Sequence, residues 1–536
     1  MHLSRFFVFA AFILSLSTNL PAAEAGDTQD GMTARQVAEQ YMREEMADEA
    51  EFRSLIVDSL GKTHVRLDQM HEGVPVFAGQ TIIHIGPNDE VVGITDARRQ
   101  VGEVDMTPAL SAKDAVRRVK QAQQLRGRLQ AETKLMVYVA QAQTSLAWHV
   151  NLYGLDRQGN PVDWTALVDA HDGAIHLSYD DLKTERDDPP GQVDESPGQD
   201  HESSPGRDDD DDGDNDIPTL GVAYTLYSGT VDLATDPYED GGYAMRDPSR
   251  GGSYTTDMLD KRVGDGELFV DEDNQWGDFT NDDRATAGAD AHYGLAVTWD
   301  YYLQVHNRLG IYEKGKGILS RVHFGNDYVN AYWSAACQCV TYGDGDGVTA
   351  NPLVSIDIIA HELTHGVTAA TADLIYTGES GGLNESMSDI FATAVEFYAA
   401  DFTDTIPEYW AGEDVWTPEI PDDALRYLDD PTRDGRSIDH YDDYTPNMDV
   451  HYSSGLTNHV FYLLSEGGPH ASTGELVTAI GRDQAAQVFY LALTGYMTPD
   501  TDFAGAKQAT MDAALELYGS ETAQLVGAAW AACGVD

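Results

Sequence analysis

The chain has 536 residues, with 91 Asp and Glu against 33 Lys and Arg, which gives a formal net charge of −58. Because like charges repel, this balance argues against nucleic acid or an anionic membrane as a partner. At roughly 150 residues per domain, the length also excludes a single compact core and predicts several folded units.

Residues 1–25 have the pattern of a secretion signal. Arg5 precedes a largely apolar stretch at 6–16, and Ala23-Glu24-Ala25 has the small-x-small form that signal peptidase accepts. The apolar stretch is much shorter than the ~20 residues of a membrane-spanning helix. We therefore expect cleavage after Ala25 and a secreted, extracellular protein without a membrane anchor.

Two small α+β modules are predicted in residues 26–105 and 106–182. The first combines a helical pattern with short alternating strands, and the second has one helix followed by three strand-like runs. The expected helices span 34–46 and 112–124, and the clearest strand patterns span 74–83, 135–140, 145–152 and 162–168.

Residues 183–218 lose the hydrophobic pattern, and Asp, Glu, Ser, Pro and Gly dominate them, including the run of Asp at 208–212. This composition is typical of a solvated linker that proteases can reach. Beyond it, we expect a β-rich half at 219–370 and an α-helical half at 371–536.

Three cysteines, Cys337, Cys339 and Cys533, allow at most one intramolecular disulfide. Stability must therefore come from packed cores and metals rather than from a disulfide framework. Cys337 and Cys339 would share one face of an extended strand, where a direct bridge is strained, so the pairing stays open.

The segment His361-Glu362-Leu363-Thr364-His365 is a candidate metal site. On a helix, a spacing of four puts both imidazoles on one face, where they can bind a single zinc ion. Glu362 then lies beside the metal, where its carboxylate can take a proton from zinc-bound water. The alternative is a core helix with incidental histidines.

A second segment weakens that alternative. Glu385 and Asp389 are also four residues apart, so they share a helical face. Glu385 can complete a set of three protein ligands that leaves one position for water, as catalytic zinc requires. Asp389 is expected to orient a ligand histidine, and we expect Asn384 in the same layer around the ligands.

These residues resemble the thermolysin family of zinc metalloendopeptidases, through His361 to His365 followed by Asn384-Glu385 and Ser388-Asp389. The resemblance extends over residues 219–536. Further matching segments are 290–302, 330–333, 342–347 and 481–483. The resemblance implies an α+β fold with a two-lobed catalytic domain and the zinc site in the cleft between the lobes.

The resemblance also implies how peptide bonds are cut. Glu362 would activate the zinc-bound water and pass its proton to the leaving amine. Tyr376 and His451 would donate hydrogen bonds to the developing oxyanion, with Asp449 holding the imidazole of His451.

Substrate binding is implied in the same way. Asn330 and Ala331 resemble an edge strand that pairs with the backbone of a peptide, and Arg426 matches a residue that binds substrate carbonyl groups. Ile358 and Leu425 are expected to line an apolar pocket. We therefore expect cleavage on the amino side of bulky hydrophobic residues in protein and peptide substrates.

Structural calcium is a further implication, since hard carboxylate oxygens suit that ion. One site of a single ion is expected, and two acidic loops resemble further sites, with plain solvated surface as the alternative for each loop. The implied ligands are Asp357, Glu396, Glu408 and Glu413, with Asp404 as an alternative, and Asp271, Asp273 and Asp423 in the two loops.

The segments 71–77 and 148–152 resemble propeptide modules that accompany such proteases. They imply a monomeric zymogen whose own propeptide is an intramolecular inhibitor until the linker is cut. Two other classes remain as alternatives: a zinc peptidase specialised for a terminal residue, and a secreted metal-binding or adhesion protein without catalysis. The combination of Glu362, Tyr376 and His451 disfavours the non-catalytic class.

Overall fold

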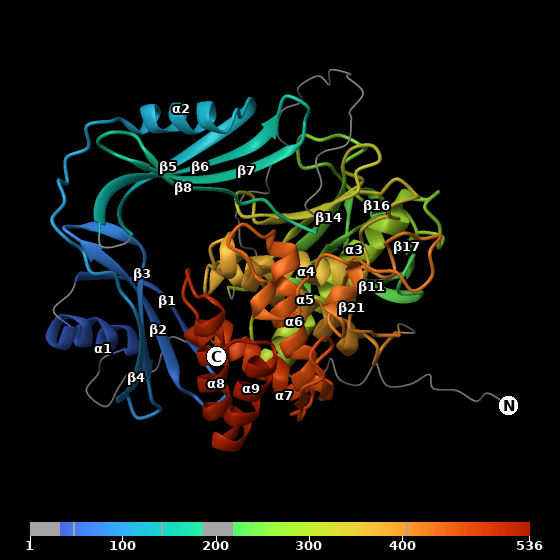
Figure 1. Ribbon diagram of the computed structural model, residues 1–536. Helices are drawn as coiled ribbons and strands as arrows, with labels where there is room; N and C mark the ends of the chain where they lie inside the picture. The colour runs from blue at the N-terminus through green and yellow to red at the C-terminus, as the bar shows by residue number, and fades with distance from the viewer. Residues whose placement is uncertain (1–32, 47–48, 141–142, 186–217, 313, 404–405) are drawn as a thin grey trace.

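The computed structural model describes residues 33–46, 49–140, 143–185, 218–312, 314–403 and 406–536. The predicted secretion signal, Asp404 and most of the predicted linker lie outside these residues. A curved sheet with two helices forms the first part, and it lies against a β-rich lobe and a helical lobe (Figure 1). This arrangement confirms the predicted α+β fold with a two-lobed domain behind a smaller front part. In the described residues, no helix has both the length and the apolarity needed to cross a bilayer.

The front part is built on one eight-stranded sheet in the order β1-β2-β3-β5-β6-β7-β8, with β4 paired to β3. Its two halves correspond to the two predicted modules and meet at a single parallel pairing, Val76 with Val137. The elements are α1 Ala34–Tyr41, η1 Met42–Met46, β1 Glu49–Val57, β2 Thr63–His71, β3 Val74–Ile85, β4 Val91–Ala97, α2 Ala112–Ala122, β5 Gly127–Ala140, β6 Gln143–Asp156, β7 Pro161–Asp169 and β8 Ile175–Asp180.

Both helices of the front part start at a capping box. Thr33 caps α1 with Gln36 as its partner, and Ser111 caps α2 with Asp114. Each box satisfies backbone N–H groups that the first turn of a helix leaves without partners. The start of each helix is therefore set locally, whereas α1 ends earlier than its pattern predicts because the chain continues as a short π-helix.

The β-rich lobe contains two sheets and the long helix α3. Helix α3 is buried over most of its length and separates the sheets from the helical lobe. The elements are β10 Thr219–Tyr224, β11 Thr230–Pro237, η2 Glu239–Gly241, β12 Tyr243–Ala244, β13 Arg246–Asp247, η3 Pro248–Arg250, β14 Ser253–Asp257, β15 Glu267–Leu268, β16 Val270–Asp271, β17 Gln275–Trp276, α3 Arg284–His306, β18 Leu319–Val322, β19 Ala331–Ser334 and β20 Cys339–Tyr342.

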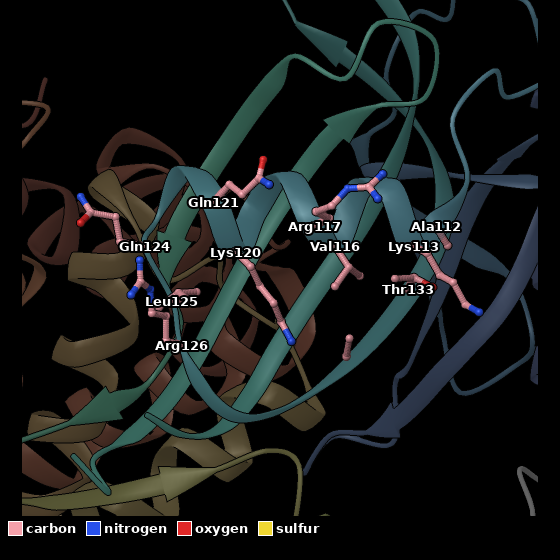
Figure 2. Close-up of a pocket in the computed structure, with 11 residues that line it drawn as sticks. Ala112, Lys113, Val116, Arg117, Lys120, Gln121, Gln124, Leu125, Arg126 and Thr133 are labelled. Carbon is pink, nitrogen blue, oxygen red and sulfur yellow. The ribbon is translucent and has the colours of Figure 1, made fainter. Parts of the chain in front are cut away.

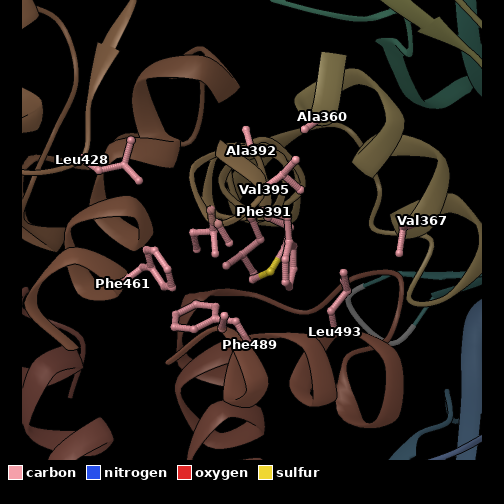
Figure 3. Packing of buried hydrophobic residues seen from close by; sticks show 14 of the residues in the cluster. Ala360, Val367, Phe391, Ala392, Val395, Leu428, Phe461, Phe489 and Leu493 are labelled. Atoms are coloured by element: carbon pink, nitrogen blue, oxygen red, sulfur yellow. The ribbon is translucent and has the colours of Figure 1, made fainter. Parts of the chain in front are cut away.

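The helical lobe packs around α5, whose apolar side chains meet those of α6 and α7 (Figure 3). Phe391, Phe461 and Phe489 are fully buried at this junction, which stabilises the lobe by removing apolar area from water. The elements are α4 Ile356–Ala370, α5 Gly378–Ala399, β21 Trp410–Ala411, β22 Arg426–Tyr427, η4 Pro431–Asp434, η5 Tyr441–Asp443, α6 Val450–Glu466, β23 Gly468–Pro469, β24 Leu476–Val477, α7 Arg482–Leu491, η6 Ala492–Tyr496, α8 Phe503–Tyr518 and α9 Ser520–Ala532.

The predicted linker begins later than residue 183. Lys183 and Thr184 form β9 (Lys183–Thr184), which pairs antiparallel with β19 at the edge of the seven-stranded sheet. The composition of the segment did not indicate this strand, because the hydrogen bonds that hold β9 come from a partner almost 150 residues away in the chain.

A disulfide joins Cys337 to Cys339 in the turn between β19 and β20, and Cys533 is free and buried. The left-handed backbone of Gln338, with φ of 52°, brings the two cysteines together. The bridge therefore closes a tight turn, whereas the sequence pattern considered an extended strand.

A buried arginine attaches the front part to the helical lobe. Arg66 on β2 donates hydrogen bonds to the carbonyl oxygens of Leu493, Thr494 and Met497, at 3.2, 2.9 and 2.6 Å. These carbonyls lie at the end of the π-helix η6, where backbone acceptors are left without helical partners. The arginine satisfies them and fixes the position of the first module.

Two histidines lie beside Arg66. From their surroundings we predict that acid weakens the contact between the first module and the helical lobe. The Nδ1 atoms of His64 and His84 are 2.8 Å apart, against the ring of Tyr496. Burial lowers the pKa of His84 to about 3, and the positive charges of His64, Lys62 and Arg66 act in the same direction, opposed by Asp58. An unfolded histidine has a pKa of about 6.5, so the unfolded state binds more protons between these values.

Stability of the precursor should therefore fall as the pH decreases from about 6.5 towards 3. The melting temperature of the unprocessed protein at pH 7 and pH 5 measures this effect. His84→Leu removes the titrating group, so its melting temperature should depend less on pH than that of the wild type. An equal pH dependence in the two proteins would show that His84 is not responsible.

Candidate metal and catalytic site

Helix α4 presents the two motif histidines to the centre of the molecule. Ser355 precedes its first turn, and Asp357 in that turn is favourable at the positive end of the helix dipole. The apolar side chains of the helix, including Ile359, Leu363 and Val367, are buried on the opposite faces. Burial on both sides fixes the rotation of the helix, and His361 and His365 consequently face α5.

Three donor atoms converge between α4 and α5. The Nε2 atoms of His361 and His365 are 3.1 Å apart, and they lie 3.3 and 3.4 Å from the two carboxylate oxygens of Glu385. All three side chains are buried. Two neutral imidazoles and one carboxylate are a donor set suited to zinc, and the set leaves a coordination position open. The residues therefore fit the zinc ion that the sequence predicts.

The outer nitrogens of the histidines are held by hydrogen bonds. His361 donates from Nδ1 to Asp389 Oδ1 at 2.9 Å, and His365 donates from Nδ1 to Asn384 Oδ1 at 2.8 Å. Ser388 Oγ also lies 3.1 Å from His365 Nδ1. A proton on Nδ1 leaves Nε2 unprotonated and able to bind a metal. The positions predicted for Asp389 and Asn384 agree with this arrangement.

Asp389 is the most heavily bonded carboxylate of the site. Besides His361, it accepts hydrogen bonds from Arg426 Nη2 at 2.7 Å, Arg426 Nε at 2.9 Å and Asn458 Nδ2 at 2.7 Å. Burial by itself would raise the pKa of Asp389, but the charge of Arg426 and the bond from His361 lower it well below the usual range. Asp389 therefore stays ionised and fixes the imidazole of His361.

Glu362 is fully buried next to the ligand set. Burial raises the pKa of its carboxyl group well above the usual value, and the nearby carboxylates of Glu185 and Glu385 act in the same direction. A carboxylate made more basic in this way suits the removal of a proton from water.

Tyr376 and His451 lie on the other side of the ligand set. The Tyr376 hydroxyl contacts Glu385 Oε1 and is 3.5 Å from His451 Nε2. His451 donates from Nδ1 to Asp449 Oδ1 at 2.8 Å. Burial opposes a charge on His451, but the carboxylates of Glu385 and Asp449 outweigh it and raise the pKa of His451 to about 9. At neutral pH the imidazole is therefore a cation with two donors.

A close helix contact brings these groups to the zinc ligands. Helix α5 carries Glu385 and α6 carries His451, and the helices meet at Gly382 and Ser453. A Cβ atom at Gly382 would lie 2.5 Å from Ser453 Oγ, which is closer than real Cβ atoms approach. Glycine at this position therefore permits the short distance between the two helices.

The chain itself fills the cleft beside these residues. The carbonyl oxygen of Thr184 accepts a hydrogen bond from His451 Nε2 at 2.6 Å. The N–H of Glu185 donates to the carbonyl oxygen of Ala331 at 3.4 Å, and Arg426 Nη1 donates to the carbonyl oxygen of Glu185 at 3.0 Å. Ala331 and Arg426 thus bind the backbone of this segment, which is the end of the described front part, and substrate binding by these two residues stays a prediction.

Asn330 directly precedes strand β19. Its Oδ1 atom accepts the N–H of Ala331 at 2.9 Å, and its carbonyl oxygen accepts the N–H of Gly343. The residue is therefore placed beside the peptide-binding edge, where the sequence predicts it.

Four of the predicted calcium ligands gather near the start of α4, together with Asp414, which the sequence analysis missed. Burial and the neighbouring carboxylates raise the pKa of Glu396 well above its usual value and that of Glu413 to about 9. Asp357 and Glu408 are among the neighbours that produce these shifts. Within the described residues, Glu396 Oε2 and Glu413 Oε2 are buried without a hydrogen-bond partner.

The other predicted calcium ligands are engaged in their own loops. Asp271 Oδ1 accepts the N–H groups of Asp273 and Asn274, at 2.8 and 2.6 Å. Asp423 accepts hydrogen bonds from the hydroxyls of Tyr427 and Thr417, at 2.9 and 2.7 Å. These contacts show how the loops are shaped, and calcium at either place stays a prediction.

Another cluster of metal-ligand residue types, formed by Asp439, His459 and His470, does not resemble an open site. Both ring nitrogens of His470 are used, since Nε2 donates to the carbonyl of Asp439 and Nδ1 accepts N–H groups. His459 likewise donates to Leu428 and accepts from Ala471. The cluster therefore connects loops through hydrogen bonds.

A cavity of about 670 Å³ lies between α2 and β5, in the front part and away from the ligand set (Figure 2). It is lined by the stems of Lys113, Arg117 and Lys120 together with small residues such as Ala112 and Thr133. It contains none of the site residues described above, so it is not the catalytic cleft.

Three residues of the site escaped the sequence analysis: Thr184, Glu185 and Asn458. Asn458 lies two helical turns after His451, so a search along that face of α6 could have found it. Thr184 and Glu185 stand at the start of the acidic segment, and no feature of their local sequence indicates a cleft.

Comparison with known proteins agrees with the site. Sequence models of the thermolysin metallopeptidase catalytic domain and of its α-helical domain match residues 220–369 and 372–535, and the fungalysin/thermolysin propeptide motif matches 48–97. The front part thus contains a propeptide motif of this family. The precursor of protealysin, a metalloproteinase from Serratia proteamaculans, is similar at 30% identity, over 53% of this chain and 87% of that one, with a TM-score of 0.44.

Two curated relatives are similar over most of the chain. The transglutaminase-activating metalloprotease of Streptomyces mobaraensis is 38% identical over 503 residues, which is 90% of this chain and 60% of that protein. Thermolysin of Alicyclobacillus acidocaldarius subsp. acidocaldarius is 36% identical over 494 residues, 87% of this chain and 82% of that protein. Since both models of the catalytic region match, and thermolysin is similar over most of both chains, the chain belongs to the thermolysin family of zinc metalloendopeptidases.

Proposed function

We propose that the protein is a secreted zinc endopeptidase, made as a zymogen, that cuts protein and peptide chains on the amino side of bulky hydrophobic residues. The observation that supports this most strongly is the backbone at Thr184 and Glu185. The peptide bond between these two residues lies between His451 and Arg426, next to the zinc ligands, in the position that a bond of the substrate would take. The signal-like stretch at 1–25 supports secretion.

Zinc bound by His361, His365 and Glu385 would supply Lewis acidity, which polarises a carbonyl group and makes water more acidic. Glu362 takes a proton from the attacking water and gives it to the nitrogen of the leaving amine. His451 and Tyr376 donate hydrogen bonds to the oxygen on which negative charge develops.

Residues further along the cleft hold the substrate in position. Ala331 accepts the N–H on the amine side of the bond, and Arg426 donates to the next carbonyl. Edge-strand pairing of this kind reads the main chain, so side-chain preference must come from a pocket. Ile358 is buried on α4 and Leu425 precedes Arg426, and we propose that they form this pocket.

Casein hydrolysis by the mature protein tests this function. Activity should disappear with a zinc chelator and return when zinc is restored. New amino termini in the digest should begin mainly with large apolar residues, whereas termini that begin mainly with charged residues would contradict the proposed pocket. Release of single terminal amino acids would indicate an exopeptidase instead.

We also propose that calcium stabilises the mature enzyme through Asp357, Glu396, Glu408, Glu413 and Asp414. Buried carboxylates repel one another, and a divalent cation would relieve that repulsion. At a calcium concentration of about 100 times Kd, binding would add roughly 2.7 kcal/mol to stability. The melting temperature should therefore rise when calcium is added.

Glu413→Gln should diminish this calcium-dependent rise, because it removes one charge from the cluster. Glu521→Gln, the same chemical change at an exposed position near the start of α9, is the matched comparison and should keep the rise. A melting temperature that is indifferent to calcium in the wild type would rule out the proposed ion.

The propeptide is proposed to inhibit the enzyme until it is removed. Strand β9 occupies the edge of β19 that a substrate would use, and Lys183 Nζ lies 5.2 Å from the ring centre of Tyr376. Purified precursor should therefore hydrolyse casein far more slowly than the mature enzyme at equal concentration. We further propose that the enzyme cuts itself, which purified Glu362→Gln protein that matures alone would refute.

A further inference from the structure

The end of the propeptide crosses the cleft in one defined register. Strand β9 runs antiparallel to β19, with Lys183 opposite Trp333 and Thr184 opposite Tyr332. Antiparallel pairing fixes which carbonyl and which N–H group face each position of the edge strand. The register therefore determines which peptide bond lies between His451 and Ala331.

Each side of the bond between Thr184 and Glu185 is held by a different catalytic or binding group. On the carbonyl side, Thr184 O accepts from His451 Nε2 at 2.6 Å. On the amine side, the Glu185 N–H donates to Ala331 O at 3.4 Å, and Arg426 binds the following carbonyl.

The Glu185 side chain is buried against the site, with Oε2 at 2.9 Å from Arg426 Nη2 and Oε1 at 3.7 Å from His361 Nδ1. Within the described residues, Glu185 Oε1 has no hydrogen-bond partner. The side chain thus occupies the position expected for the residue after a cut, and its one strong partner is the arginine that also holds its backbone. This double attachment prevents a shift of the register by one residue.

We propose that the first maturation cut falls between Thr184 and Glu185. This inference rests on the proposed peptidase activity and assigns one bond to it. Glu185 is not the bulky apolar residue that the proposed pocket prefers, so this intramolecular cut is placed by the strand register and by Arg426 rather than by the pocket. Oxygen from one water molecule bonds to the carbonyl carbon of Thr184, and the bond from that carbon to the nitrogen of Glu185 breaks. The proton that Glu362 removes from the water goes to that nitrogen. The products are a propeptide that ends in a Thr184 carboxylate and a catalytic part that begins with the Glu185 amine.

The neighbouring bonds do not meet these groups. The carbonyl of Lys183 lies one residue earlier, where its strand partner is Trp333. The carbonyl oxygen of Glu185 accepts its hydrogen bond from Arg426 and not from His451. It lies one residue beyond the carbonyl that His451 holds. Within the described part of this segment, the Thr184–Glu185 bond is thus the one whose carbonyl oxygen accepts from His451 and whose N–H donates to Ala331. Later trimming of the segment 186–218 would follow the first cut.

The test uses the full-length precursor, purified with a chelator and started by adding zinc. Intact mass and labelling of new amino termini are followed from the earliest time points. The first pair of products should end at Thr184 and begin at Glu185. A first pair that arises anywhere in 186–218, with the Thr184–Glu185 bond still intact in the mature protein, would overturn the proposal.

Two proline variants sharpen the assignment. Glu185→Pro removes the N–H that Ala331 accepts and should slow the first cut by roughly 100-fold. Asp188→Pro is the matched change three residues later and should leave the first cut within about twofold of the wild-type rate. The reverse pattern, or normal maturation of Glu185→Pro with the same termini, would contradict the proposed bond.

Failure of this inference can be told from failure of the proposed function. Casein hydrolysis is measured for the matured wild type and for each variant after its propeptide is removed by an added protease. Hydrolysis of casein with a first cut elsewhere rejects the assigned bond alone. Absence of casein hydrolysis in the zinc-loaded mature protein rejects the peptidase function as well.

Discussion

Replacing Glu362 with glutamine should lower kcat for casein hydrolysis by about 10²- to 10⁴-fold, the usual contribution of a general base. The amide has nearly the same shape as the carboxylate, so it preserves packing at a side chain that is fully buried. It cannot accept a proton from water, and KM should therefore change little.

The comparison for this variant is Glu521→Gln, the same chemical change at an exposed position near the start of α9. Glu521→Gln should retain wild-type activity. The Glu362→Gln precursor should also accumulate uncut, with normal zinc content by metal analysis. If the Glu362→Gln protein kept activity within a few-fold of the wild type, Glu362 would not be the base.

Asp389→Asn should weaken zinc binding by roughly 10- to 100-fold, the usual effect of losing a hydrogen-bonding partner of a metal ligand. In the structure, both Asp389 oxygens accept hydrogen bonds, and the donors are His361, Arg426 and Asn458. An amide offers only one acceptor oxygen, and its NH₂ group would face a donor. The imidazole of His361 would lose the bond that holds its orientation.

This experiment is best done in the Glu362→Gln background, so that all proteins compared are uncut precursors. Zinc retention is measured against increasing concentrations of a competing chelator. Asp483→Asn, at a side chain that is 94% exposed, is the matched control and should release zinc at the wild-type chelator concentration. Equal zinc retention in Asp389→Asn and Asp483→Asn would show that Asp389 does not support the metal.

The zinc ligands and the base could be predicted because their geometry is local. His361 and His365 lie one helical turn apart, and Glu385 and Asp389 repeat the same spacing on the next helix, so each pair is placed by helix periodicity alone. The resemblance to a family then extended the prediction to Tyr376, His451 and Arg426, which lie on other elements. The structure brings all of these side chains together.

Glu185 shows what local patterns could not reveal. Its neighbours in the sequence are charged and polar, and such a composition is typical of a solvated linker. Its burial depends on Ala331 and Arg426, which lie far away in the chain. The same reason explains why Asp414 was missed, since its place beside Asp357 follows from the loop after α5 rather than from any repeat.

The sequence by itself therefore determined the metal, the two-lobed architecture and the presence of a propeptide, through periodicity, residue type and family resemblance, and it predicted the base. Only the tertiary structure decided which segment occupies the cleft, which peptide bond faces His451, and how Arg66 attaches the front part to the helical lobe. The physical reason is that helix spacing is set by bonds within a few residues, whereas strand register and burial of charge depend on partners distant in the chain.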